Sequence, residues 1–139
     1  MKFLFAFIFI LLTGVLPLNG QVPDSSKYQS LGPYYFHLEY LKKDSSLLID
    51  VRQPFEFKGR RIKNAINIPS SGNIERAADT LNKDFAYFLY CLTDHRSRRV
   101  AETLYDKGFR KLFNLEGGIV AWRKDGMPVE KGKIRKKRK

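Results

Sequence analysis

The chain of 139 residues contains a single cysteine, Cys91, at a position that favours reactivity. It directly follows an apolar run of strand length, residues 85–90, and a short polar loop and a helical pattern come after it. Where a strand meets a helix, backbone N–H groups and the helix dipole favour an anion. Because the thiolate is the reactive form of cysteine, we expect Cys91 to be a nucleophile. A buried structural cysteine is the alternative, since free cysteines are among the most buried residues.

The cysteine and histidine counts limit the chemistry further. One cysteine excludes an internal disulfide, so Cys91 is either a free reactive thiol or a site that pairs with a redox partner protein. His37 and His95 are the only histidines, and no group of side chains has the spacing of a metal site. We therefore predict chemistry that uses neither a metal nor a cofactor.

The first 20 residues have the pattern of a secretory signal peptide. Lys2 precedes an almost wholly apolar run, residues 3–18, and small and polar residues end it. The run is slightly longer than the usual apolar region of a signal and short for a membrane span. We predict cleavage after Gly20, export to the periplasm or the medium, a linker at residues 21–27 and no stable membrane insertion afterwards. An uncleaved anchor is the alternative.

The formal net charge of +12 is concentrated at the C-terminus. Seven positive charges lie in residues 131–139 and one at Lys2, which leaves four for the body of the protein. The C-terminal segment has no apolar periodicity, so we predict a disordered basic tail at residues 131–139. Such a tail can touch nucleic acid or an anionic membrane, but an exported protein meets little nucleic acid. We therefore predict no nucleic-acid partner.

Strand patterns and helical patterns alternate along the body of the chain. Strands are expected at residues 28–31, 47–51, 65–68, 85–90 and 111–114. Helices are expected at residues 33–43 and 73–82, and a short helical turn is expected to begin at Pro54. Two more helices are expected, one from the end of the Cys91 loop to Lys107 and one between Gly117 and Gly126. In the first of these helices, Tyr34, Tyr35, Leu38 and Leu41 repeat at helical spacing and are expected in the core.

This alternation predicts an α/β fold with a mainly parallel sheet. In such sheets, ligands bind beyond the carboxyl ends of the strands. Asp50 to Arg52, Pro69 with Ser70, and Cys91 each follow or end a predicted strand. We therefore expect these three segments to face one shared crevice.

The order of several short motifs resembles a single-domain rhodanese, a member of the rhodanese-like sulfurtransferase family. The motifs are Leu48-Ile49-Asp50-Val51-Arg52, Glu56-Phe57, Ala65-Ile66-Asn67-Ile68-Pro69, Tyr90-Cys91, Arg96-Ser97 and Asn114-Leu115-Glu116-Gly117-Gly118, followed by Trp122 and Gly126. The resemblance covers residues 28–130. It implies a rhodanese-like three-layer fold, in which helices flank a mainly parallel central sheet.

The resemblance also implies a mechanism. The Cys91 thiolate would take the outer sulfur of a small donor such as thiosulfate, and the persulfide would pass it to a thiol or to cyanide. Backbone N–H groups of the following loop would cradle the sulfur, and Arg96 would bind the oxyanion of the donor. Asp50, Arg52 and Glu56 would support the loop as ion pairs without entering the chemistry. The predicted substrate-binding residues are Leu92, Thr93, Asp94, His95, Arg96 and Ser97.

Loop length and one unusual residue define the alternatives. Four residues separate Cys91 from Arg96, whereas the related loop of cysteine-type phosphatases has five, so sulfur transfer is favoured over phosphate hydrolysis. Asp94 stands where many active members of the family have glycine, and its Cβ and negative charge oppose turnover with an anionic donor. A catalytically weak binding or redox-sensing module is therefore the second hypothesis. Arg61, with Arg60 before it, replaces a common histidine, and this pair is expected to form a basic rim near the crevice.

Overall fold

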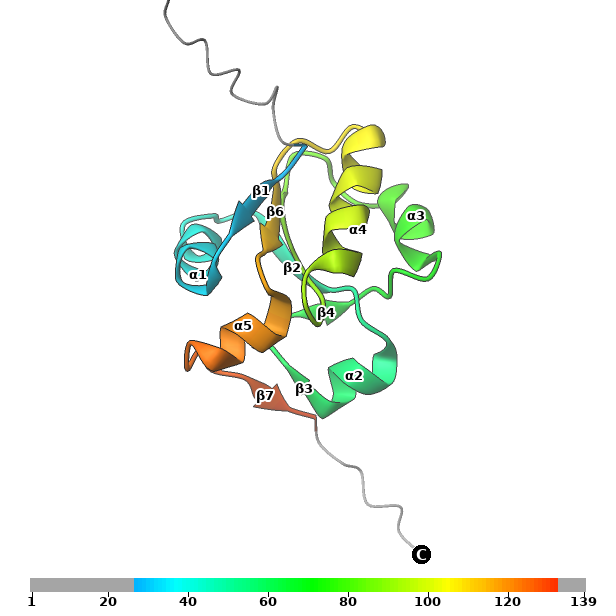
Figure 1. Cartoon of the computed structure of the whole chain (residues 1–139). Helices are drawn as coiled ribbons and strands as arrows, with labels where there is room; N and C mark the ends of the chain where they lie inside the picture. Colours follow the sequence, from blue (N-terminus) through cyan, green and yellow to red (C-terminus); the bar gives the residue numbers. More distant parts are fainter. Residues whose placement is uncertain (1–26, 133–139) are drawn as a thin grey trace, which may run out of the picture.

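The computed structural model describes residues 27–132 (Figure 1). The elements are β1 (Gln29–Leu31), α1 (Pro33–Leu41), β2 (Ser46–Asp50), α2 (Pro54–Gly59), β3 (Arg60–Arg61), β4 (Ile66–Asn67), α3 (Asn73–Ala78), β5 (Ala86–Tyr90), α4 (His95–Asp106), β6 (Leu112–Leu115), α5 (Gly118–Lys124) and β7 (Glu130–Lys131). Within this part of the chain, no helix has the length and apolar character needed to cross a bilayer. The predicted signal peptide at 1–20, all of the linker but Lys27, and the tail from 133 lie outside the described residues.

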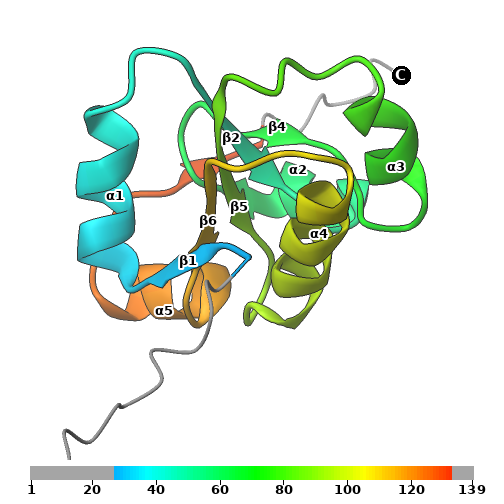
Figure 2. The same ribbon diagram turned by 90° about the horizontal axis from the view of Figure 1, so that it is seen from above.

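Five parallel strands form the central sheet in the order β1-β6-β5-β2-β4. Figure 2 shows α1 and α5 on one face of this sheet and α3 and α4 on the other. The prediction of an α/β fold with a mainly parallel sheet between helical layers is therefore confirmed. Parallel strands need a long crossover connection, usually a helix, and the alternating sequence pattern supplies one.

The core consists of two apolar clusters, one on each face of the sheet. Along β5, Tyr87 and Leu89 point into the cluster beneath α3 and α4, whereas Phe88 and Tyr90 point into the cluster beneath α1 and α5. Side chains alternate between faces along a strand, so Cys91, two residues after Leu89, continues into the α3–α4 cluster. The alternation of β5 thus decides on which face of the sheet the thiol lies.

The prediction for the core face of α1 is wrong. Of the four residues expected in the core, Tyr34, Tyr35 and Leu41 are 61%, 65% and 66% exposed and Leu38 is half-buried, whereas Phe36 is buried. Phe36 packs edge-to-face on Phe88 and on Trp122 of α5, at centroid distances of 5.3 and 6.4 Å. Aromatic residues occur all around this helix, so its sequence does not define one apolar stripe. The docking partners on the sheet and on α5 select the face that is buried.

Two other boundaries differ from the sequence-based expectation. The helix expected at 73–82 ends at Ala78. The two-residue strands β3 and β7 form a separate antiparallel ribbon that was not predicted. This ribbon contains Lys131, the first residue assigned to the disordered tail, paired with Arg60. A pairing of two residues on each side is too short to produce a recognisable strand pattern.

The contribution of β5 to the core can be tested by the same change, leucine to alanine, at a buried and at an exposed position. Leu89→Ala is expected to lower the free energy of unfolding by about 2–5 kcal/mol, because Leu89 is fully buried and its truncation leaves a cavity. Leu41→Ala, the same change at an exposed position of α1, is expected to change it by no more than about 0.5 kcal/mol. Urea unfolding followed by circular dichroism measures both, and equal losses would contradict the described core.

Candidate active site

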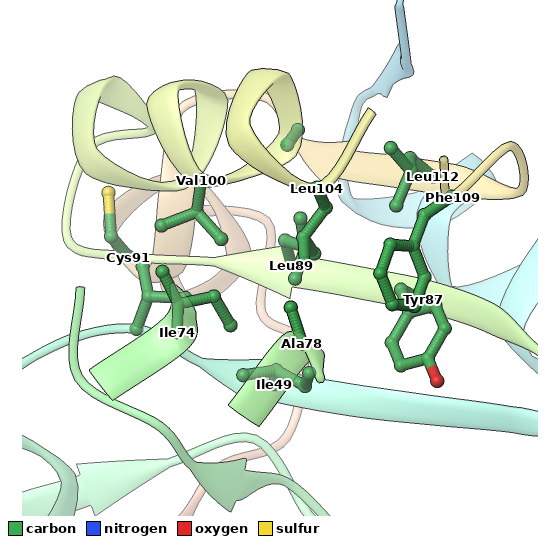
Figure 3. Packing of buried hydrophobic residues seen from close by; sticks show 12 residues of the cluster. Ile49, Ile74, Ala78, Tyr87, Leu89, Cys91, Val100, Leu104, Phe109 and Leu112 are labelled. Atoms are coloured by element: carbon green, nitrogen blue, oxygen red, sulfur yellow. The ribbon is translucent and has the colours of Figure 1, made fainter. Parts of the chain in front are cut away.

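The Cys91 side chain lies at the carboxyl end of β5 and is 1% exposed. Figure 3 shows its sulfur directed toward the first turn of α4, next to Val100. The backbone N–H of Asp94 donates to Sγ at 3.2 Å, and the Ser97 Oγ lies 3.6 Å from Sγ. A backbone donor and a hydroxyl at the start of a 12-residue helix therefore surround the sulfur, as expected for a site that stabilises negative charge.

Asp94 adopts the left-handed backbone conformation that normally belongs to glycine, with φ of 93°. This conformation turns the chain at the start of α4, directly after the N–H that faces Sγ. Its carboxylate accepts a hydrogen bond from Gly117 N at 3.2 Å and lies 3.9 Å from the Arg98 guanidinium. The departure from glycine is thus accommodated, because the Cβ does not prevent the turn and the charge has two partners away from the loop itself.

The loop carbonyls are bound by the start of α5. Ile119 N donates to Cys91 O at 2.9 Å, and Val120 N donates to Leu92 O at 3.1 Å. Gly118 lies so close to the loop that a Cβ at this position would overlap Leu92 O and Cys91 O. The predicted loop residues Leu92, Thr93 and His95 are exposed at the surface around the buried sulfur.

Arg96 forms a bidentate ion pair with Glu56 of α2. Its two terminal nitrogens lie 2.9 and 3.0 Å from the carboxylate oxygens. Glu56 also accepts the Gln53 N–H at 2.9 Å, which caps α2. The hydrogen bonds between Arg96 and Glu56 hold the pKa of Glu56 below its usual range. The same hydrogen bonds raise the pKa of Arg96, to which Cys91 makes a smaller contribution. An oxyanion bound by Arg96 would share the guanidinium with Glu56.

Asp50 and Arg52 form a second ion pair. The Arg52 side chain donates three hydrogen bonds to the Asp50 carboxylate at 2.6–3.1 Å and one to Arg60 O at 2.6 Å. Burial by itself lowers the pKa of Arg52, but the hydrogen bonds and the charge of Asp50 outweigh it and raise the pKa. The pair joins the end of β2 to β3, and only Glu56 of the predicted supporting set touches Arg96.

A cavity of about 320 Å³ opens beside the loop, between α3 and α4. Its polar lining includes Ser70, His95, Arg96 and Arg99, and its apolar wall includes residues of the cluster that contains Cys91. Of the three segments expected to share a crevice, Ser70 and the end of the Cys91 loop line this cavity, whereas Cys91 itself and Asp50 to Arg52 are not among its lining residues. Arg60 and Arg61, expected on the rim, lie in β3 and are not among the lining residues.

Asn114 is the residue of this region that sequence analysis missed as part of the site. It is fully buried in β6 and accepts a hydrogen bond from Ser97 Oγ at 2.7 Å. A lone asparagine within the apolar strand Leu112–Leu115 was the available signal, since a buried amide needs a polar partner. Across residues 27–132, no three His, Cys, Asp or Glu side chains lie close enough together to hold a metal ion.

The fold and this loop are those of a cysteine-centred α/β domain, and comparison with known proteins identifies the family. The Rhodanese-like domain model matches residues 37–125, so the chain belongs to the rhodanese-like family. A sulfurtransferase of Allochromatium vinosum is 32% identical over 83 residues, which are 60% of this chain and 77% of that protein. A rhodanese-related crystal structure from Thermoplasma volcanium has a TM-score of 0.66 and 31% identity, covering 74% of this chain and 98% of that one.

Other relatives are longer than the shared region. The uncharacterized protein YqhL of Bacillus subtilis is 41% identical over 75 residues, which are 54% of this chain and 59% of that protein. A tRNA uridine(34) hydroxylase of Chlamydia caviae is 28% identical over 130 residues, which are 88% of this chain and 38% of that protein. The rhodanese-like region therefore occurs in proteins with different names and lengths.

The Arg96–Glu56 pair predicts a pH dependence of stability. Because the folded-state pKa of Glu56 is lowered, its contribution is complete above the unfolded pKa and is lost as the pH falls through the folded value. We expect Glu56→Gln to cost about 1 kcal/mol at neutral pH and less in acid. Urea unfolding between about pH 7 and pH 3 measures this. The matched change Glu102→Gln, at an exposed position of α4, should leave the dependence of the unfolding free energy on pH unchanged. The prediction would be contradicted if the parent protein, Glu56→Gln and Glu102→Gln all showed parallel curves.

Proposed function

We propose that the protein is a sulfurtransferase or sulfur carrier that works through a Cys91 persulfide. The observation that carries this proposal is the sulfur of Cys91 at the start of α4, within 3.2 Å of the Asp94 N–H, in a rhodanese-like chain. The thiolate attacks the outer sulfur of thiosulfate. A new S–S bond forms, the bond between the sulfurs of the donor breaks, and its electron pair leaves with sulfite.

The second half of the reaction regenerates the thiolate. A thiolate or cyanide attacks the outer sulfur of the persulfide, and the electron pair of the broken S–S bond returns to Cys91. The cationic side chains beside the cavity, Arg96 and Arg99, attract an anionic donor. No external oxidant or reductant is needed, because the sulfur passes as a neutral atom from one nucleophile, sulfite, to another, the acceptor, and each leaving group keeps the electron pair of the broken bond.

The loop length argues for sulfur over phosphate. Four residues separate Cys91 from Arg96, and one backbone N–H of this loop, that of Asp94, lies at hydrogen-bond distance from the sulfur. A phosphate would need several N–H groups directed at its oxygens. The similarity to a protein named sulfurtransferase supports the same choice.

Mass spectrometry of the intact protein after incubation with thiosulfate tests the proposal. We expect a species heavier by one sulfur atom, which cyanide removes and which Cys91→Ser does not form. Because Cys91 is the only cysteine, any thiol-bound sulfur must lie on it. Absence of the adduct with thiosulfate and with an organic persulfide would overturn the proposal. Hydrolysis of an aryl phosphate that depends on Cys91 would favour a phosphatase instead.

Asp94 separates the sulfurtransferase from the second candidate, a binding or redox-sensing module. The turn that this residue needs is already formed, so we expect its charge to limit turnover more than its backbone does. Asparagine tolerates the left-handed region and removes the charge. Asp94→Asn should therefore raise thiosulfate:cyanide turnover several-fold, and Asp94→Gly should add little more.

The steady-state rates of these two variants are compared with that of the parent protein. A rate that rises only with glycine would show that the backbone is limiting. A parent protein that forms no adduct, beside an active Asp94→Asn variant, would identify a binding module that lost turnover.

A further inference from the structure

A chain of buried polar side chains leads from the sulfur to the edge of the sheet. Ser97 and Asn114 are both fully buried. Ser97 Oγ lies 3.6 Å from Cys91 Sγ and 2.7 Å from Asn114 Oδ1, and Asn114 Nδ2 lies 2.9 Å from Ser30 Oγ. The strand register explains the arrangement, because Asn114 of β6 pairs with Ser30 of β1 on one side and with Leu89 of β5 on the other.

The direction of the Ser97 hydrogen bond matters, because a hydroxyl has one hydrogen to donate. Three acceptors compete for it: Asn114 Oδ1 at 2.7 Å, Asp94 O at 3.0 Å and Cys91 Sγ at 3.6 Å. Since Asn114 Nδ2 donates to Ser30, its Oδ1 faces Ser97 and takes the hydrogen. Ser97 can then only accept from Cys91, and this arrangement fits the protonated thiol.

Charged groups also act on the sulfur and must be kept apart from this effect. The Arg96 guanidinium is bound by Glu56, and Arg96 lies close enough to Cys91 for the sulfur to contribute to the raised pKa of Arg96. The Asp94 carboxylate is bound to Gly117 N, and His95 lines the neighbouring cavity. The Asp50–Arg52 pair lies at the end of the adjacent strand β2. None of these groups is replaced when Ser97 or Asn114 is changed to an uncharged residue.

We infer that Asn114 is a positioning residue that controls the direction of the Ser97 hydroxyl and thereby the stability of the Cys91 thiolate. When the thiolate or persulfide forms, the sulfur needs the hydrogen that Asn114 holds. The hydroxyl must then turn away from Asn114, or the amide must rotate by half a turn. After that rotation, Nδ2 donates to Ser97, Ser30 donates to Oδ1, and the Ser97 hydrogen is free for the sulfur.

The test measures the ionisation of Cys91 by its rate of alkylation with iodoacetamide, a neutral probe, as a function of pH. Asn114→Leu keeps the approximate shape of the side chain and removes Asn114 Oδ1, the nearest of the three acceptors. Asp94 O and the sulfur remain, and of these two the charged thiolate is the stronger acceptor. We expect the midpoint of the pH–rate profile to fall by roughly half to one pH unit, because the Ser97 hydroxyl then donates to the thiolate. Ser97→Ala should raise the midpoint, since it removes that donor.

The double variant decides whether Asn114 acts through Ser97. In the Ser97→Ala background, Asn114→Leu should leave the midpoint unchanged. An equal shift with and without Ser97, or no shift in either, would overturn the inference. A purely structural role of Asn114 lowers stability without this dependence on Ser97.

Asn114→Asp provides a second cycle if Asn114→Leu does not fold. A carboxylate can only accept, so the midpoint should rise, and it should rise more when Ser97 is present than in the Ser97→Ala background. Equal rises would reflect charge alone and overturn the inference. Alkylation requires no sulfur donor, so its outcome is independent of whether the proposed sulfur transfer occurs.

Discussion

The site depends on one constraint, which is the central position of β5 in a parallel sheet. The strand pairs with β2 on one side and with β6 on the other, and all its residues are buried. A shift of one residue would move every side chain to the opposite face, so that Phe88 and Tyr90 would enter the cluster shaped for Tyr87 and Leu89. The register is therefore strongly determined, and with it the direction of Cys91, which continues the strand into the cluster below α4.

The loop after β5 is held by elements that are distant in the sequence. The Arg96 guanidinium binds Glu56 of α2, the carbonyls of Cys91 and Leu92 accept from the start of α5, and Ser97 binds Asn114 of β6. Each contact fixes one part of the loop, so the N–H that faces the sulfur is already oriented before any substrate binds. Such preorganisation lowers the cost of stabilising negative charge at a reacting atom.

The fold was largely predictable, and the reason is visible in particular elements. The strand at 86–90 and the order of helices and strands follow from local apolar patterns, which is why the α/β architecture could be predicted. The core face of α1 could not be predicted, because Tyr34, Tyr35 and Phe36 are all aromatic and neighbouring. Of these three, only Phe36 meets partners on the sheet and on α5. The β3–β7 ribbon was missed because Arg60 and Lys131 become partners only after the whole chain has folded.

Three properties of the site follow from the order of residues along the chain: the identity of the candidate nucleophile, the four-residue spacing to Arg96 and the alternation that directs Cys91. These properties depend on neighbouring residues, whose geometry the backbone restricts. The tertiary structure alone decided the partners of the polar groups: Glu56 for Arg96, Gly117 for Asp94 and Asn114 for Ser97. A hydrogen bond requires two atoms within about 3 Å, and residues far apart in the chain reach that distance only when the sheet and helices bring them together.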